Sequence, residues 1–292
     1  MVPNAEHSVH QVKRLLKRTA WKILPQSTIQ LIKKRHYLRL LRSPLLEKEP
    51  ELRVVRYLVK QGDTVIDIGA NVGVYSKILS VLVGAEGHVY SIEPFPPTFE
   101  ILCYNVRKLH LDNVEPVNVA VSDSEAVVTM AIPYDPSGAE THYRASIITD
   151  RPEEGKTETA NVQAIKIDSR FLSESGTISF IKCDVEGHEP ACIKGAAKFL
   201  ARSQPAWLIE VSGEPDNANS AAHSVFKILC DQGYSAWWYD GSKLRKRRPG
   251  DKSTNYFFLK ENHIDILKNL CIEPKKIHPH PDNNNRDEAA TQ

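Results

Sequence analysis

The stretch that decides the fold is residues 61–76, which read QGDTVIDIGANVGVYS. Residues 65–68 are a short apolar run that predicts a buried strand, and residues 69–73 follow as a turn of small side chains. Apolar residues then recur at helical spacing, at Val74, Ile78, Leu79 and Leu82. A strand, a glycine turn and a helix point backbone N–H groups and a helix N-terminus at a ligand. The glycines let the backbone approach that ligand without a Cβ in the way.

The spacing of the glycines argues against two common classes of ligand, dinucleotides and the phosphates bound by P-loops. A dinucleotide-binding turn reads G-x-G-x-x-G, whereas here Asn71 takes the middle position and Val74 replaces the third glycine. No Lys-Ser or Lys-Thr pair follows the turn, so it is not a phosphate-binding P-loop. The pattern acid-x-Gly-x-Asn-x-Gly, which starts at Asp67, resembles the first motif of S-adenosylmethionine-dependent methyltransferases. The alternative is a tight connection that binds no ligand.

The composition bounds the class of protein. A chain of 292 residues with 41% hydrophobic side chains is long enough for one large α/β domain with extensions. Its formal net charge of +2 does not call for nucleic acid as a partner. The sequence predicts neither a transmembrane helix nor a signal peptide. Five scattered cysteines without a CxxC pair predict a reducing, cytoplasmic setting: Cys103, Cys183, Cys192, Cys230 and Cys271.

Residues 88–92 predict the second strand, and Glu93 follows it directly. An acid about 20 residues past a glycine turn, at the end of the next strand, is where ribose hydroxyls are bound. A carboxylate can accept hydrogen bonds from both hydroxyls at once. Glu93 is therefore a candidate cofactor ligand, with a chance surface position as the alternative.

The third strand is expected over residues 114–121, and an added strand over 127–132. Ser122 and Asp123 end the third strand, where they could meet an adenine amino group or open a hairpin turn. Residues 133–160 are polar and too long for an ordinary connection, so they predict a substrate lid or a disordered insertion. The remaining periodicities predict helices over 96–110, 190–200 and 225–231, strands over 162–167, 178–185, 206–211, 234–239 and 256–259, and a basic loop over 243–248.

A second group of residues bears on function. Strands at the centre of a parallel sheet read as continuous apolar runs, but the strand predicted at 178–185 carries Lys182 and Asp184. Both side chains point to the same face, and an unpaired buried charge is very costly. These charges must lie at the carboxyl end of the strand, where a ligand crevice opens, or pair with neighbours such as Asp67 and Glu210.

Residues 181–189, which read IKCDVEGHE, make the resemblance specific. With residues 67–76 before them and 208–210 after them, they resemble the FkbM family of methyltransferases over about residues 62–260. The resemblance implies an α/β fold: a doubly wound, Rossmann-like, seven-stranded, mostly parallel sheet with a reversed last strand (the class I methyltransferase fold). It also implies S-adenosylmethionine as cofactor and O-methylation of a hydroxyl on a sugar, glycan or related polyhydroxylated natural product.

The motifs assign candidate site residues. In an in-line methyl transfer the protein orients the hydroxyl and takes its proton late. A histidine beside carboxylates suits that role, so we expect His188 or Glu186 as the base and Asp184 to place the methionine amine or the acceptor. Alternatively, these three residues hold Mg²⁺ or Ca²⁺ against the acceptor oxygens. The residues expected to bind the cofactor are Asp67, Gly69, Ala70, Asn71, Gly73, Glu93, Ser122, Asp123 and Asp184.

Residues 1–46 hold ten Lys or Arg residues and a single acid, Glu6. We expect a helical extension packed on the catalytic domain with a solvated basic face. The alternative is peripheral membrane contact, with an amphipathic arm on an anionic surface or a lipid-linked acceptor. The chain is thus expected to divide into a basic helical extension (1–50), a methyltransferase domain (51–262) and a partly disordered C-terminal extension (263–292).

The sequence leaves two other functional classes open. One is an NAD-dependent oxidoreductase, which the missing third glycine disfavours. The other is a non-catalytic glycan-assembly protein that keeps the cofactor fold as a scaffold. The expected partner is a small-molecule or glycan acceptor, with no nucleic acid.

Overall fold

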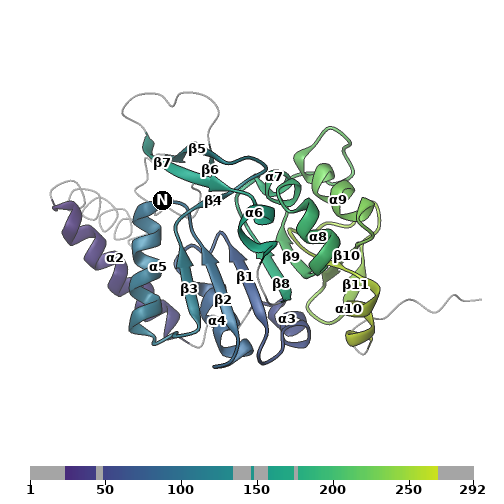
Figure 1. The fold of residues 1–292 in the computed structure, drawn as a ribbon, viewed down its shortest axis with the longest axis horizontal. Coiled ribbons are helices and arrows are strands. Elements are labelled where there is room, and N and C mark those ends of the chain that lie inside the picture. The colour runs from purple at the N-terminus through teal and green to yellow at the C-terminus, as the bar shows by residue number, and fades with distance from the viewer. Residues whose placement is uncertain (1–23, 44–48, 134–145, 148–156, 174–176, 269–292) are drawn as a thin grey trace, which may run out of the picture.

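The computed structural model describes residues 24–43, 49–133, 146–147, 157–173 and 177–268. Its centre is an eight-stranded sheet in the order β11-β10-β12-β9-β8-β1-β2-β3 (Figure 1). These strands are β1 Thr64–Ile68, β2 His88–Ile92, β3 Val114–Val117, β8 Ile178–Cys183, β9 Ala206–Glu210, β10 Ser235–Tyr239, β11 Leu244–Lys246 and β12 Asn255–Leu259.

The strand directions confirm the predicted sheet. β9, β8, β1, β2 and β3 run parallel, and β12 is antiparallel to both of its neighbours. β11 adds an eighth strand, because residues predicted as a basic loop pair antiparallel with β10, Trp237 facing Lys246. The chain runs from β1 to β2 and β3 on one side, and through β8 to β9 on the other. Such a reversal opens a crevice at the carboxyl ends of β1 and β8.

Helices cover both faces of this sheet, as the doubly wound fold requires (Figure 1). Along β1, Val65 belongs to the buried cluster that includes Leu79 of α4, whereas Ile66 belongs to the cluster that includes Ile193 of α7. The helices around the first cluster are α3 Leu52–Leu58 and α4 Val74–Val83, with α5 Pro96–Lys108 beside them. The helices around the second are α6 Ile167–Phe171, α7 Glu189–Lys194, α8 Ala197–Ser203 and α9 Ala221–Asp231.

The helix predicted over 190–200 is two helices, because α7 ends where Gly195 meets another backbone. A Cβ on Gly195 would lie 2.0 Å from the carbonyl oxygen of Ser122. The carboxylate of Asp168 then accepts from the backbone N–H groups of Lys198 (3.1 Å) and Phe199 (2.8 Å) in the first turn of α8. Contacts distant in sequence therefore end one helix and start the next.

The strand predicted over 114–121 also divides. β3 ends at Val117, and the Asn118 side-chain amide donates to the carbonyl oxygens of Glu93 (2.8 Å) and Pro94 (2.9 Å). The chain then enters a second sheet in the order β4-β7-β5-β6. Its strands are β4 Ala120–Val121, β5 Ala126–Pro133, β6 Ser146–Ile147 and β7 Thr157–Ile165. Residues 134–145 and 148–156 of the predicted lid or insertion lie outside the described residues.

The N-terminal extension contributes α2 Gln26–Leu41, which packs against α5 (Figure 1). Lys34 forms an ion pair with Glu100 of α5 at 3.1 Å, and Lys77 of α4 donates to the carbonyl oxygen of Leu41 at 2.6 Å. At the other end, α10 Glu261–Ile266 crosses the predicted boundary at residue 262. Among the described helices, none is long and apolar enough to cross a membrane. The four described cysteines are free thiols.

Candidate active site

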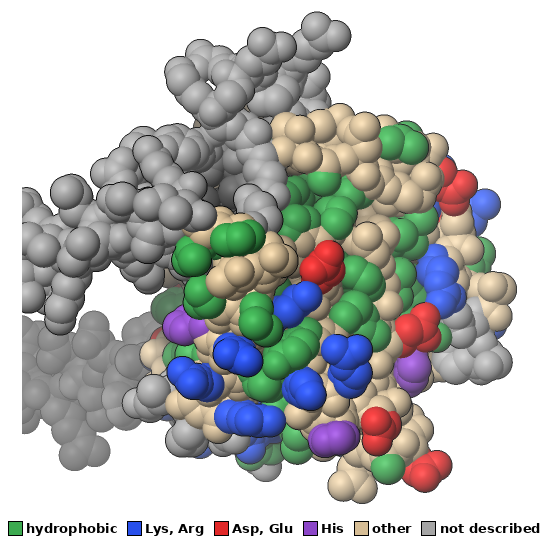
Figure 2. All heavy atoms as spheres, turned by 90° about the vertical axis from the view of Figure 1, so that its left-hand side faces the viewer, with side chains coloured by type: hydrophobic (Ala, Val, Ile, Leu, Met, Phe, Trp, Pro, Cys, Tyr) green, Lys and Arg blue, Asp and Glu red, His purple; other side chains and the backbone are tan. Residues whose placement is uncertain are grey.

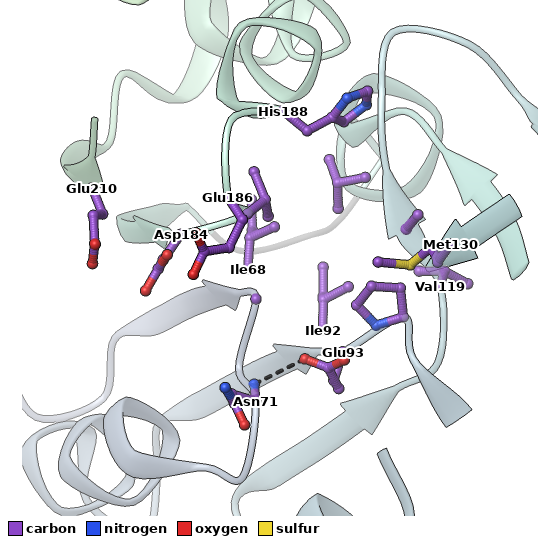
Figure 3. Close-up of a pocket in the computed structure, with 15 residues that line it drawn as sticks. Ile68, Asn71, Ile92, Glu93, Val119, Met130, Asp184, Glu186, His188 and Glu210 are labelled. Carbon is purple, nitrogen blue, oxygen red and sulfur yellow. Dashed lines mark hydrogen bonds between the residues drawn. The ribbon is translucent and has the colours of Figure 1, made fainter. Parts of the chain in front are cut away.

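A cavity of about 250 Å³ lies at the carboxyl ends of β1, β2 and β8 (Figure 3). The predicted site residues that line it are Gly69, Asn71, Glu93, Asp184, Glu186 and His188. Asp67 and Ala70 line a second cavity that adjoins it. Three predicted residues line neither cavity: Gly73, Ser122 and Asp123.

The glycine turn packs closely against the backbone that follows β8. Gly69 has a φ of +78°, and a Cβ there would lie 1.8 Å from the backbone carbonyl oxygen of Asp184. The backbone N–H of Asp184 donates to the carbonyl oxygen of Ile68 at 3.0 Å, which holds the two strand ends together. Close approach of a ligand was the expected reason for this glycine, whereas the contact seen is with the turn after β8.

Glu93 lies directly beside the glycine turn, as its sequence position predicts. Its carboxylate oxygens accept from the backbone N–H groups of Asn71 (3.0 Å) and Phe95 (2.9 Å). Each oxygen has a further lone pair for a hydroxyl donor. Burial raises the pKa of Glu93 to about 7, although the two backbone N–H groups oppose that shift. The side chain is thus fixed in place at the end of β2.

Charged residues in β1 and β8 form a buried group on the α4 side of the sheet. Asp67 and Lys182 are register neighbours, and Lys182 donates to Asp184 at 3.1 Å. Ser76 of α4 donates to Asp67 at 2.7 Å, and the ammonium of Lys182 stands 4.8 Å from the ring centre of Tyr75. Burial lowers the pKa of Lys182, but Asp184 and Asp67 outweigh burial and raise it overall. Lys182 is thus paired, but its ion-pair partner is Asp184, whereas the expected partner Asp67 acts on it through its nearby charge.

Three carboxylates gather on one side of the cavity. Figure 3 shows the side chains of Asp184, Glu186 and Glu210 next to one another, with His188 set apart from them. Burial and the nearby charges of Asp184 and Glu186 together raise the pKa of Glu210 to about 7, against the opposing effect of Lys182. Glu210 can therefore exchange a proton near neutral pH.

The turn that carries Glu186 is held by Glu189. The buried Glu189 carboxylate accepts from the backbone N–H groups of Val185 (3.2 Å) and Gly187 (3.0 Å). Glu186 and Gly187 both have positive φ, at +52° and +99°. Because left-handed backbone at a residue other than glycine is unfavourable, these hydrogen bonds help to hold Glu186 at the cavity.

His188 faces a different neighbour from the one its sequence position suggests. Its Nε2 lies 3.0 Å from the hydroxyl oxygen of Ser122. Burial lowers the pKa of His188, and only Asp123 opposes that shift. In the folded protein burial therefore favours the neutral ring. Ser122 thus contacts His188 instead of lining the cavity.

The second cavity, of about 580 Å³, shares Gly69, Asn71, Asp184 and Glu210 with the first. Its other walls include two residues of the quoted motifs, Tyr75 of α4 and Lys182 of β8, and several residues that no motif indicated. The latter include Tyr37 and Leu40 of α2, Glu49 and Glu51 before α3, and Asn255 of β12. The two cavities therefore meet at the carboxylates that end β8 and β9.

The divalent-metal alternative finds no support in the part of the chain that the structure describes. No group of three His, Cys, Asp or Glu side chains there is arranged to hold a metal ion. His188 contacts Ser122 and lies apart from the carboxylates, so Asp184, Glu186 and His188 do not converge.

The donor set of the smaller cavity fits a nucleoside with a charged tail. Glu93 can accept from ribose hydroxyls, Ile92, Val119 and Met130 offer apolar surface for a base, and Asp184 can attract an ammonium. With the strand order of the sheet, this site defines a class I S-adenosylmethionine-dependent methyltransferase. Within that class the chain belongs to the FkbM methyltransferase domain family, whose sequence model matches residues 67–236. S-adenosylmethionine is therefore its cofactor.

Other known proteins are similar over shorter or more divergent stretches. The protein-L-isoaspartate O-methyltransferase of Ignicoccus hospitalis is 34% identical over 87 residues, which is 28% of this chain and 40% of that protein. That of Methanothrix thermoacetophila is 29% identical over 77 residues, 26% of this chain and 35% of that protein. The chain thus spans less than half the length of these relatives.

Two solved structures are similar at low sequence identity. The FkbM methyltransferase of Methylobacillus flagellatus is 16% identical with a TM-score of 0.44, covering 68% of this chain and 43% of that chain. The Aeropyrum pernix fibrillarin, solved with S-adenosyl-L-methionine, is 15% identical with a TM-score of 0.42, covering 69% of this chain and 67% of that chain.

The sequence missed several residues of the two cavities. Glu210 was considered only as a partner for Lys182, although a lone acid at the end of an apolar strand was a usable signal. Met130 and Asn255 carried no such signal, because only the packing of β5 and β12 brings them to the site.

Proposed function

We propose that the protein transfers a methyl group to a hydroxyl of a polyhydroxylated acceptor, such as a sugar or glycan. The observation that carries the proposal is a group of three carboxylates: Asp184 and Glu210 line both cavities, and Glu186 lines the smaller cavity beside them. Carboxylates accept hydrogen bonds from hydroxyl groups. One of the three, Glu210, has a pKa of about 7, which suits a general base at neutral pH.

The smaller cavity is the proposed cofactor site. Glu93 is proposed to accept from the ribose hydroxyls, and the turn from Gly69 to Gly73 to present the backbone of Gly69 and Asn71, which line this cavity, to the methionine part. Asp184 is proposed to attract its amine. Asp67, bonded to Ser76, is proposed to hold β1 and α4 in place for this contact. When bound, the cofactor supplies an electrophilic methyl group on a sulfonium, so the protein needs to orient the hydroxyl and take its proton.

Adenine recognition by Ser122 and Asp123 has less support. Both side chains stand outside the cavity lining, whereas Val119, Ala120 and Val121 line it. We therefore propose that the base rests on apolar and backbone groups of this segment. Ser122 then acts on the site only through its contact with His188.

The larger cavity is the proposed acceptor site, with Glu210 as the first candidate base. Its lining combines carboxylates with Asn255, Tyr75 and Lys182, a set that can exchange hydrogen bonds with several hydroxyls. Glu186 and His188 remain candidates from the sequence. Both line only the smaller cavity, but Glu186 lies beside Asp184, which lines both cavities, whereas His188 is set apart from the carboxylates and is therefore the weaker candidate for an acceptor in the larger cavity.

A carboxylate acceptor, as the names of the archaeal isoaspartate relatives indicate for those enzymes, fits the site less well. Its charge would meet Asp184, Glu186 and Glu210 at short range, and like charges repel in a partly buried site. Membership of a methyltransferase family also sets aside the NAD-dependent oxidoreductase and the non-catalytic scaffold.

The test is methyl transfer from methyl-labelled S-adenosylmethionine to a panel of acceptors. We expect label in free sugars, glycosides or polyhydroxylated natural products, and none in peptides that contain isoaspartate. Calorimetry with S-adenosylhomocysteine and with NAD provides the binding control. Label that enters only carboxyl groups, as base-labile esters, would overturn the proposed acceptor class while leaving the cofactor site intact.

A further inference from the structure

Helix α2 has an unusual composition for a helix on the surface of a nearly neutral protein. Over Gln26–Leu41 it carries four cationic residues, Lys33, Lys34, Arg35 and Arg39, and no acid at all. Arg42 follows as its C-terminal cap. The whole chain, by contrast, has 38 basic and 36 acidic residues.

The exposed side of α2 combines the three arginines with aliphatic side chains, whereas Lys33 is buried. Leu31, Arg35 and Arg42 recur at helical spacing along one stripe, with Ile32 and Arg39 beside it, and all five are exposed. Leu31 and Ile32 keep 43% and 44% of their surface exposed. The opposite side packs inward through Ile29, Leu38 and Leu41. The inner side of the helix is thus mostly apolar and includes the buried Lys33, whereas its outer side carries Leu31 and Ile32 together with exposed arginines.

The exposed aliphatic residues of the protein are concentrated at this helix. Among the residues that the structure describes, eight large hydrophobic side chains are exposed, and four of them are Leu24, Leu31, Ile32 and Leu40. Scattered single hydrophobic residues on a surface are ordinary, but a group of them beside cations marks an interaction site.

Further cations from α5 border this face. Arg107 and Lys108 in the last turn of α5 are exposed, and Arg42 lies next to them, its guanidinium 3.5 Å from the carbonyl oxygen of Lys108. Figure 2 shows this side of the molecule, where blue Lys and Arg side chains gather around green apolar ones and most red acidic ones lie outside the group. Glu100 of α5 forms an ion pair with Lys34 on this side.

We propose that this face of α2 binds an anionic membrane surface. Leu31 and Ile32 enter the headgroup region, while Arg35, Arg39 and Arg42 contact lipid phosphates. An interfacial helix needs this combination, because the buried aliphatic area and the attraction between cations and anionic lipids add together. The exposed apolar residues are aliphatic, whereas single-stranded nucleic acid is bound by aromatic side chains on which bases stack.

The docking also orients the proposed acceptor site, a consequence that rests on the proposed function. Tyr37 and Leu40 of the same helix line the larger cavity. A membrane-bound α2 therefore brings this cavity close to the lipid surface. An acceptor carried on that surface would meet the site without diffusing through solution.

The test is sedimentation of the full chain with vesicles of phosphatidylcholine alone, or of phosphatidylcholine and phosphatidylglycerol in equal parts. We expect binding to the mixed vesicles only, weakened by added salt. Each basic residue near an anionic surface contributes about 1 kcal/mol, or about fivefold. Arg35→Gln, Arg39→Gln and Arg42→Gln together should therefore lower the partition coefficient about a hundredfold. Leu31→Ser with Ile32→Ser should also weaken binding.

Matched controls change the same kinds of side chain elsewhere. Lys194→Gln with Lys198→Gln removes two exposed cations from α7 and α8, and Val81→Ser removes an exposed aliphatic residue of α4. Both controls should bind vesicles as the unmodified chain does, and all variants should keep their affinity for S-adenosylhomocysteine.

Three results would overturn the proposal. They are no binding to mixed vesicles, binding that the α2 variants retain in full, and tight binding to single-stranded RNA that the α2 variants abolish while vesicles are ignored. None of these assays contains an acceptor. Their outcome is therefore separate from that of the methyl-transfer test.

Discussion

The crevice at the end of β8 and the outer face of α2 both concentrate charge, but in opposite ways. Lys182 is 4% exposed and held between Asp67 and Asp184, whereas Arg35 and Arg39 are exposed to solvent. In the crevice, burial and neighbouring charges move pKa values of carboxyl groups toward neutrality. On α2, solvent and salt screen the charges. In the crevice, the surroundings of each charged residue therefore set its protonation and its function. On α2, the total number of cations determines the strength of the attraction to an anionic surface.

Within the crevice, the largest expected effect on stability is that of a substitution at Gly69. Gly69→Ala places a Cβ against the carbonyl oxygen of Asp184 in addition to the strain of a positive φ. We expect a loss of more than about 4 kcal/mol in the free energy of unfolding, or no folded protein. Gly250→Ala is the control, because Gly250 has a φ of +88° with open space around it, so it should lose only about 1–2 kcal/mol in urea unfolding. Equal losses would contradict the close packing of the turn against β8.

Turnover should depend most on Glu210. Glu210→Gln should lower the rate per folded molecule about a hundredfold to ten-thousandfold, the usual contribution of a general base. A base works when deprotonated, so the rate of the unmodified enzyme should fall as pH drops through about 7, and this limb should be absent in the variant. Glu214→Gln, an exposed acid four residues later, should have no effect. An unchanged pH profile in Glu210→Gln would assign the base to Glu186 or His188.

Removing one cation from each region compares the two environments directly. Lys182→Met leaves Asp67 and Asp184 without their counter-charge and should lower the free energy of unfolding by about 3–5 kcal/mol. Arg35→Gln should change it by less than about 0.5 kcal/mol. Adding Asp67→Asn to Lys182→Met should recover part of the loss, because the two residues interact. Urea unfolding of all four proteins measures this, and a double variant no more stable than Lys182→Met would argue against the pairing.

Cofactor affinity should depend on Glu93. Glu93→Ala should weaken S-adenosylhomocysteine binding by about 1–3 kcal/mol, the range for hydrogen bonds to a charged group. Because the pKa of Glu93 is about 7 and the carboxylate is the acceptor, affinity of the unmodified protein should fall as pH drops below 7. Glu115→Ala, which removes an exposed acid of β3, is the control in calorimetry. Full affinity in a folded Glu93→Ala variant would remove this residue from the cofactor site.

The smallest effect is expected at His188. His188→Ala should slow turnover by less than about tenfold, because the ring contacts Ser122 and lies apart from the carboxylates. Ser122→Ala should have a similar effect, since it removes the same contact. A loss of a hundredfold or more in His188→Ala alone would instead support the histidine as the base.

Local patterns in the sequence determined the elements and the class of the protein. Three features were predicted from residues adjacent in the sequence, and each lies where it was expected: the glycine turn after residues 65–68, Glu93 after the second strand, and residues 181–189. Strand and helix periodicity and the backbone freedom of glycine are properties of short segments. These features, and the membership of the FkbM family, could therefore be predicted from the sequence.

Only the tertiary structure decided which of these residues touch one another. It divided the predicted strand at Asn118 and the predicted helix at Gly195, and it turned a predicted loop into β11. In the folded chain His188 contacts Ser122, and Gly69 packs against the backbone of Asp184. Tyr37 and Asn255, far apart in the sequence, line the same cavity. Each outcome depends on contacts between residues far apart in the chain. A single sequence does not show those contacts, because packing, not local preference, selects them.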